Sequence, residues 1–114
     1  MEDCLFCKIV KGDIPSKKID EDEDTYAFYD INPQAKVHAL VVSKHHIADI
    51  AHHEELSDHE LAACLRSCAR VAKLLGLEEG GYRVVSNCGA NACQSVQHLH
   101  FHIIGGEKLS DRMA

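Results

Sequence analysis

Residues 98–104, near the C-terminal end of the sequence given, read His-Leu-His-Phe-His-Ile-Ile. Successive side chains of a β-strand point to opposite faces, so this alternation predicts a strand with one polar and one apolar face. Three imidazoles, roughly 6.6 Å apart, would share the polar face: His98, His100 and His102. Buried imidazoles need hydrogen-bonding partners, so such a face suits a site for phosphate, protons or a metal. The alternative is a merely solvated face, which the small and polar residues of 89–95 disfavour.

The remaining patterns predict a single α+β domain over residues 1–114. The expected elements are a short helix over 4–11, strands over 16–20, 24–29 and 37–43, a long helix between Ser57 and Gly76, and strands over 82–86 and 98–104. Short links between strands and only one long helix favour an antiparallel sheet of about five strands with the helix packed on it.

The long helix has the clearest signals. Ser57 and Glu60 form a capping box, and Gly76 is a helix stop. An apolar stripe at helical spacing follows the cap: Leu61, Leu65, Cys68, Ala69, Ala72 and Leu75. Cys64 and Cys68 lie on the apolar side and are expected to be core residues.

Charge and hydropathy exclude several classes of function. A net charge of −6 argues against non-specific nucleic-acid binding, which needs a basic face. No apolar run approaches the ~18 residues of a transmembrane helix, and the acidic N-terminus lacks the basic start of a signal peptide. We therefore expect a cytoplasmic protein whose cysteines are thiols or metal ligands. The acidic run 20–23 is expected to be a solvated turn, and no glycine-rich phosphate loop is present.

His98-x-His100-x-His102 followed by two apolar residues resembles the signature of the histidine triad (HIT) family. Further matches resemble its Hint-like branch: Asp30 to Ala35, His38 with Leu40 to Val42, Lys44-x-His46-Ile47, Asn87, Gln94 to Val96, and Gly105-Gly106. The resemblance extends from about residue 4 to residue 106.

This resemblance implies an HIT-like fold whose sheet continues across a homodimer. It also implies a purine nucleoside phosphoramidate hydrolase, which binds AMP or GMP and cleaves a P–N or related bond at the α-phosphate through a nucleotidyl-histidine. The catalytic residues that it implies are His100 as nucleophile with His102, His98, His38 and Ser95. The nucleotide-binding residues that it implies are Asp30, Ile31, Asn87, Gln94, Ser95, Val96, His100 and His102.

Imidazoles suit this chemistry. A neutral imidazole is a competent nucleophile near pH 7, provided that one ring nitrogen faces phosphorus and an acceptor fixes the other. For His100 we expect this acceptor to be a backbone carbonyl. Neighbouring histidines and backbone N–H groups would stabilise the non-bridging oxygens, and Ser95 or a flanking histidine would relay a proton to the leaving amine.

Cys4-x-x-Cys7 has the spacing of half a tetrahedral zinc site. The resemblance supplies His46 and His98 as the other ligands of a closed, structural Cys₂His₂ site. The chemistry itself would need no metal, and His98 would be withdrawn from proton transfer. The alternative is a pair of half-buried thiols, whereas a redox motif lacks its βαβ context. The remaining histidines are expected at the surface: His45, His52, His53 and His59.

Two departures from the family pattern matter. Cys93 stands where the family usually has glycine, so a side chain there would crowd the phosphate loop or force a different turn. The chain also lacks the tail tryptophan of eukaryotic Hint proteins, so specificity for the leaving group does not transfer.

Other interpretations remain open at this stage. Asp30 and Asn87 also fit turn residues, Ser95 fits a surface hydroxyl, and His38 alone fits a structural residue. The alternative functions are a dinucleoside polyphosphate hydrolase of the Fhit type, a non-catalytic nucleotide-binding or scaffold dimer, and a zinc-structured protein with no nucleotide role. The Asp30 block and Gly105-Gly106 argue against the Fhit type.

Overall fold

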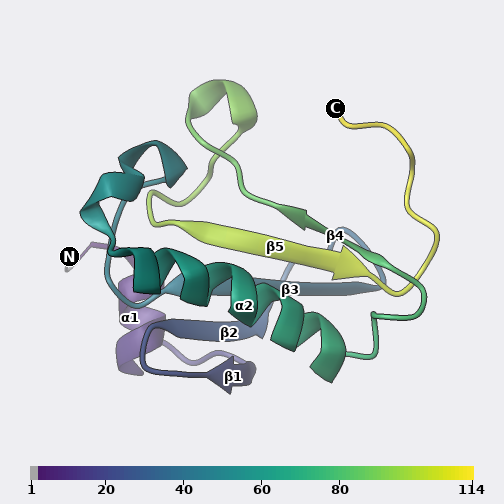
Figure 1. Ribbon diagram of the computed structural model, residues 1–114, viewed down its shortest axis with the longest axis horizontal. Helices are drawn as coiled ribbons and strands as arrows, with labels where there is room; N and C mark the ends of the chain where they lie inside the picture. The colour runs from purple at the N-terminus through teal and green to yellow at the C-terminus, as the bar shows by residue number, and fades with distance from the viewer. Residues whose placement is uncertain (1–2) are drawn as a thin grey trace.

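A five-stranded antiparallel sheet runs through the computed structural model, which describes residues 3–114 (Figure 1). The strands are β1 (Lys18–Glu21), β2 (Thr25–Tyr29), β3 (Val37–Ser43), β4 (Tyr82–Val85) and β5 (His100–Gly105), in the spatial order β1-β2-β3-β5-β4. The helices are α1 (Leu5–Lys11) and α2 (Asp58–Leu74), with 3₁₀ turns η1 (Ile50–Glu55) and η2 (Ala90–Ala92). The expected α+β architecture is confirmed.

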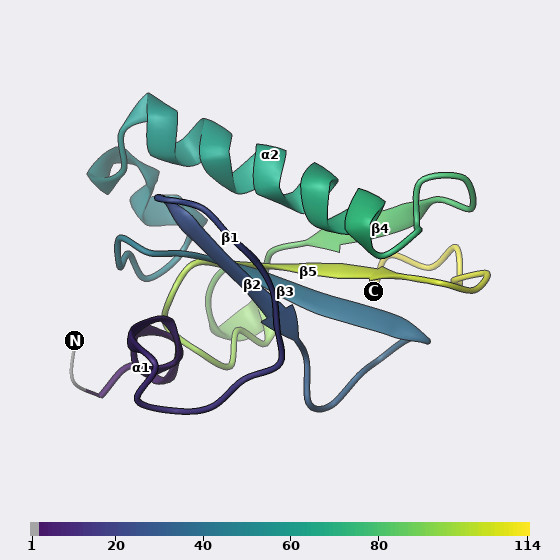
Figure 2. The same cartoon turned by 90° about the horizontal axis from the view of Figure 1, so that it is seen from below.

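The two helices cover opposite faces of the sheet (Figure 2). Val41, Phe101 and Ile103 of the sheet form one core with α2. Phe28, Leu40 and Val42 form a second core with α1. Neighbouring residues of a strand point to opposite faces, so the two residues on either side of Phe101, His100 and His102, point toward α1. The strand therefore places His100 and His102 opposite the main core.

Helix α2 begins as predicted but buries a different stripe. Both hydrogen bonds of the Ser57–Glu60 capping box are present. However, Leu65 is 63% exposed and Ala69 is exposed, so the predicted apolar stripe is wrong at these two positions. The buried positions are instead Cys64, Ser67, Cys68, Val71 and Ala72. Hydropathy does not predict this stripe, because it includes a polar residue, Ser67. The Ser67 hydroxyl can be buried because it hydrogen-bonds to the Thr25 hydroxyl.

The acidic turn between β1 and β2 is held by α2, which corrects its prediction as a simply solvated turn. Arg70 Nε donates to Asp20 Oδ2 at 2.7 Å, and Arg70 Nη2 donates to Asp22 Oδ2 at 2.9 Å. Asp22 Oδ1 also accepts from the backbone N–H of Thr25. The carboxylates thus fasten the first hairpin to the long helix, whereas the four histidines expected at the surface are exposed.

Within residues 3–114, none of the helices has the length and apolar character needed to cross a bilayer.

Candidate active site and metal cluster

The predicted strand 98–104 is wrong at its start, because β5 begins at His100. His98 lies in a bend, where its N–H donates to the Val96 carbonyl. The next residue, Leu99, donates its N–H to the Ile47 carbonyl at 2.8 Å. This tertiary contact delays the start of the strand by two residues, although Leu99 still joins the core under α2 and the His98 ring still packs on Phe6. The His98 ring consequently joins a cluster of cysteines, while His100 and His102 remain on the strand.

A cavity of about 280 Å³ lies between α1, the loop after β2 and the polar face of β5. Its apolar wall includes Phe6, Ile9 and Phe28. Six of the eight expected nucleotide-binding residues line it: Asp30, Ile31, Ser95, Val96, His100 and His102. Asn87 and Gln94 are not among its lining residues. The cavity therefore combines an apolar compartment with a carboxylate, a hydroxyl and two imidazoles.

His100 is held in one tautomer by the backbone. Its Nδ1 lies 2.7 Å from the carbonyl oxygen of His98, and a carbonyl can only accept, so Nδ1 carries the proton. Burial lowers the pKa of His100, so the ring is neutral at pH 7. The neutral ring then has its lone pair on Nε2. The predicted backbone acceptor for His100 is confirmed.

His102 is fixed through a second histidine. The backbone N–H of Gln34 donates to His38 Nδ1 at 2.9 Å, so the proton of the neutral His38 ring is on Nε2. That Nε2 lies 2.9 Å from His102 Nδ1 and 3.4 Å from Asp30 Oδ2. His102 Nδ1 therefore accepts, which leaves its own proton on Nε2. Burial lowers the pKa of His102 to about 4, and the neighbouring His100 and His38 act in the same direction.

The two strand imidazoles therefore differ in chemistry. His100 offers an electron pair at Nε2, and His102 offers an N–H at Nε2. Sequence reasoning missed the role of Gln34, because it acts through its backbone N–H and its side chain carries no signal. It also missed Phe6, whose ring packs edge-on against His100 at 5.0 Å between centroids.

The Gln94 side chain braces the loop between β4 and β5. Its Oε1 accepts from the Gly89 N–H at 2.9 Å, and its Nε2 donates to the carbonyls of Ala48 (2.7 Å) and Val96 (3.0 Å). The amide thus joins both ends of the loop and ties it to the segment after β3. This position explains why Gln94 lies outside the cavity lining while its neighbour Ser95 lies within it.

Cys93 adopts the left-handed backbone conformation, with φ 61° and ψ 38°. Glycine adopts this conformation freely, whereas other residues pay roughly 1–2 kcal/mol. The side chain is exposed, so it does not crowd the backbone. A cysteine in place of the family's usual glycine is therefore tolerated here at the cost of backbone strain at Cys93.

We expect Gln94→Ala to lower kcat/KM of the activity proposed below by about 10-fold, because it releases the loop that carries Ser95. The free energy of unfolding should fall by about 1–3 kcal/mol, because the hydrogen bonds of the Gln94 amide are lost. Steady-state kinetics and urea unfolding would measure both effects. Gln97→Ala is the matched control, because the Gln97 side chain is exposed and makes one long hydrogen bond within residues 3–114, to the Gln94 carbonyl at 3.4 Å. Equal kinetics for the two variants would contradict the bracing role.

The second cluster joins α1 to the sheet and comprises Cys4, Cys7, His46 and His98. The four ligand atoms lie within 4.8 Å of one another. The measured separations are 3.2 Å from Cys4 Sγ to His98 Nδ1, 3.3 Å from Cys7 Sγ to His46 Nδ1, and 3.1 Å between the two Nδ1 atoms. A tetrahedral zinc ion with ordinary bond lengths separates its sulfur and nitrogen ligands by roughly 3.3–3.8 Å. The measured separations are shorter than these values by about 0.2–0.4 Å, so the donor set fits a metal ion after a small outward movement of the ligand atoms.

The surroundings of this cluster also suit metal binding. His98 Nε2 donates to the Ser43 carbonyl at 2.6 Å, which directs the Nδ1 lone pair toward the cysteines. Burial lowers the pKa of His98 to about 4, which keeps the ring neutral, as a ligand must be. The backbone N–H of Cys7 donates to Cys4 Sγ at 3.4 Å and would stabilise a thiolate there. The structure thus brings together all four predicted metal-ligating residues.

The fold and the paired imidazoles define the class of the protein. A family model described as the HIT domain matches residues 11–109. The chain belongs to the HIT family, which confirms the resemblance read from its motifs. A solved structure described as a HIT family hydrolase from Clostridium thermocellum superposes with a TM-score of 0.91 at 40% identity, covering 100% of this chain and 99% of that one.

Other relatives are similar in sequence to a comparable degree, and two of them have more specific names. The adenosine 5'-monophosphoramidase of Schizosaccharomyces pombe is 48% identical over 101 residues, which are 89% of this chain and 72% of that protein. A 14 kDa zinc-binding protein from Zea mays is 44% identical over 108 residues, which are 93% of this chain and 84% of that protein. A relative from Helicobacter pylori, 45% identical over 91% of this chain and 97% of its own length, is described only as an uncharacterized HIT-like protein.

Proposed function

We propose that this chain is a nucleoside phosphoramidate hydrolase acting on derivatives of purine nucleoside monophosphates such as AMP or GMP. The observation that carries the proposal is the His100 tautomer, whose Nδ1–H is bonded to the His98 carbonyl at 2.7 Å. This bond leaves the lone pair of the neutral ring on Nε2, and the ring lines a cavity with a carboxylate, which supports His100 as the nucleophile. The name of the fission yeast relative supports the same class of reaction.

In the first step His100 Nε2 attacks the α-phosphorus and the P–N bond breaks. The Nε2–H of His102 and the backbone N–H of Val96 stabilise charge on the non-bridging oxygens. The leaving nitrogen takes a proton relayed from solvent by the Ser95 hydroxyl and departs as an amine. The product of this step is a nucleotidyl-histidine.

In the second step water attacks the same phosphorus and the P–Nε2 bond breaks. The electron pair returns to His100, and the Ser95 hydroxyl relays the proton of the attacking water to solvent. The net reaction consumes one water and yields AMP and the amine. His38 acts behind His102, because its Nε2–H fixes the His102 tautomer.

The remaining roles follow from position in the cavity. The apolar wall with Ile31 suits a purine base, and the Asp30 carboxylate suits the ribose hydroxyls. Asn87, two residues after the end of β4, and Gln94 would act on the phosphate through the loop to which they belong. We further propose that residues 1–114 form one HIT domain that works as a homodimer.

Cys4, Cys7, His46 and His98 would hold zinc as a closed structural site, and the zinc-binding relative supports this choice of metal. The ion would join α1 to the sheet and supply no chemistry to the reaction. His98 would then contribute to catalysis through its carbonyl and not through its ring.

The decisive experiment compares AMP release from adenosine 5'-phosphoramidate with AMP release from diadenosine tetraphosphate by the purified protein. We expect faster turnover of the phosphoramidate. Preferred cleavage of the dinucleotide would favour the Fhit-type alternative. AMP binding without hydrolysis of either compound would favour a nucleotide-binding or scaffold protein, and neither binding nor hydrolysis would leave only a metal-structured fold.

A further inference from the structure

We propose that the Cys4–Cys7–His46–His98 cluster controls the orientation of the nucleophilic ring, so that metal occupancy regulates the hydrolase. This inference rests on the proposed function, because it concerns the same His100. It adds a regulatory role to a site that would otherwise only hold α1 in place.

The first link runs through His98. Its ring is fixed at both nitrogens, with Nδ1 among the ligands of the cluster and Nε2 on the Ser43 carbonyl. Its backbone oxygen accepts the Nδ1–H of His100 at 2.7 Å. His98 is 0% exposed, and the peptide that carries this oxygen is also held by the Leu99 N–H, which donates at 2.8 Å to the carbonyl of Ile47, the residue after the cluster's His46. An ion that grips the ring therefore also positions the acceptor that sets the tautomer of His100.

The second link runs through Phe6, a residue of α1 that lies in the sequence between the N-cap Cys4 and Cys7. The Phe6 ring packs edge-on against both imidazoles, with centroid separations of 5.9 Å to His98 and 5.0 Å to His100. Phe6 is 5% exposed and lines the cavity beside His100. Release of the cysteines would loosen the helix and, with it, one wall against which the nucleophile rests.

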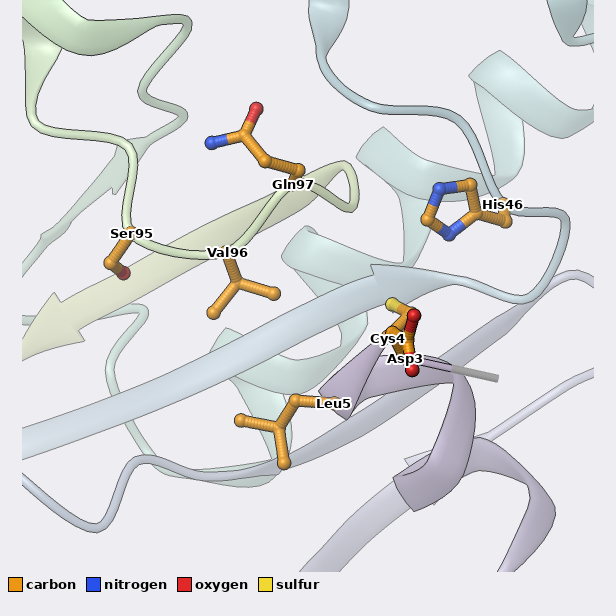
Figure 3. A pocket seen from close by; sticks show the side chains of 7 residues that line it. All are labelled: Asp3, Cys4, Leu5, His46, Ser95, Val96 and Gln97. Atoms are coloured by element: carbon orange, nitrogen blue, oxygen red, sulfur yellow. The ribbon is translucent and has the colours of Figure 1, made fainter. Parts of the chain in front are cut away.

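The cluster is also reachable from outside. A groove of about 990 Å³ is lined by His46 and Cys4 at one side and by Ser95 and Val96 at the other (Figure 3). Ser95 and Val96 line the nucleotide cavity as well, as does Leu5 from α1. Small chelators can thus approach the ligands without unfolding the chain, and the groove shares a wall with the catalytic cavity.

Loss of the ion would replace its coordinate bond to the His98 ring by hydrogen bonds from the cysteine thiols. A thiol is a weak hydrogen-bond donor, so Cys4 and Cys7 would hold the His98 ring less firmly than coordinate bonds do. Replacing groups that orient a metal ligand typically costs 10–100-fold in affinity or activity in other sites, so we expect a coupling of about that size here.

The test uses His46→Ala, which removes one ligand and leaves α1, Phe6 and His98 unchanged in sequence. The matched control is His45→Ala, since His45 is the exposed neighbour that pairs with Glu60. We expect His46→Ala to lose bound zinc and to lower kcat/KM for adenosine 5'-phosphoramidate by about 10–100-fold, with AMP affinity changed by less than about 3-fold. His45→Ala should match the wild type in all three measurements.

Imidazole ¹⁵N NMR supplies a readout that does not depend on turnover. The zinc-loaded wild type should show His100 as a single Nδ1–H tautomer, and both His46→Ala and the chelator-stripped wild type should show a mixture. Reloading the stripped protein with zinc should restore the single tautomer. Unchanged His100 signals and unchanged kcat/KM after zinc loss would overturn the coupling. Absence of hydrolysis by the loaded wild type would instead refute the proposed function, while the NMR comparison would still decide the coupling.

Discussion

His100→Ala is expected to lower kcat/KM for adenosine 5'-phosphoramidate by about 10³-fold or more, because it removes the atom that attacks phosphorus. AMP affinity should change by less than about 5-fold, since the carboxylate, the apolar wall and His102 remain in the cavity. Stopped assays of AMP release and calorimetric AMP titration would measure the two quantities separately.

Two further variants sharpen this prediction. His53→Ala is a matched control, because it removes an exposed imidazole that lies outside the cavity. His100→Gly should recover part of its activity when free imidazole is added, because the small base can occupy the vacated space and attack in place of the side chain. More than a tenth of wild-type turnover in His100→Ala would show that another group is the nucleophile.

The second large effect is expected from the double substitution Cys4→Ser with Cys7→Ser. Zinc content should fall to background and Tm should fall by about 10 °C or more, because structural zinc contributes directly to folding. Serine is the informative replacement, since Cys4 is also the N-cap of α1 and serine is a good N-cap. The loss therefore reports on the metal and not on the helix cap.

The control for the metal prediction is Cys88→Ser with Cys93→Ser, which removes two thiols outside the cluster. We expect its unfolding free energy to change by less than about 1 kcal/mol. Metal analysis and thermal unfolding of both double variants would check the prediction. A wild-type zinc content in the Cys4 and Cys7 variant would show that these residues are not ligands.

The sequence predicted those parts of the fold that short-range patterns determine. Strand β3 has the predicted bounds, 37–43, because its apolar run has no competing local signal. The start of α2 at the Ser57 cap was also predicted, since a capping box is contained within four residues. The alternation of β5 was correctly assigned from His100 onward.

The parts that failed depend on contacts between distant segments. His98 leaves the strand because Leu99 bonds to Ile47, which no local pattern announces. Leu65 lies off the buried face of α2, and Ser67 lies on it because its hydroxyl finds a distant partner in the Thr25 hydroxyl. The same reasoning explains the site. Cys4 and Cys7 are predicted from their spacing, and His46 and His98 from the family resemblance. The roles of Gln34 and Phe6, in contrast, arise from backbone and packing contacts.

Strand β5 carries the site on one face and the core on the other, which has a consequence for folding fidelity. A slip of one residue against β3 would turn both imidazoles under α2 and move Phe101 and Ile103 from the main core to the cavity face. Such a misfolded chain would lose apolar burial and would also bury two polar rings without partners. Errors of strand pairing are therefore penalised on both faces at once, so a chain that reaches a stable core has also assembled its imidazoles in the correct orientation.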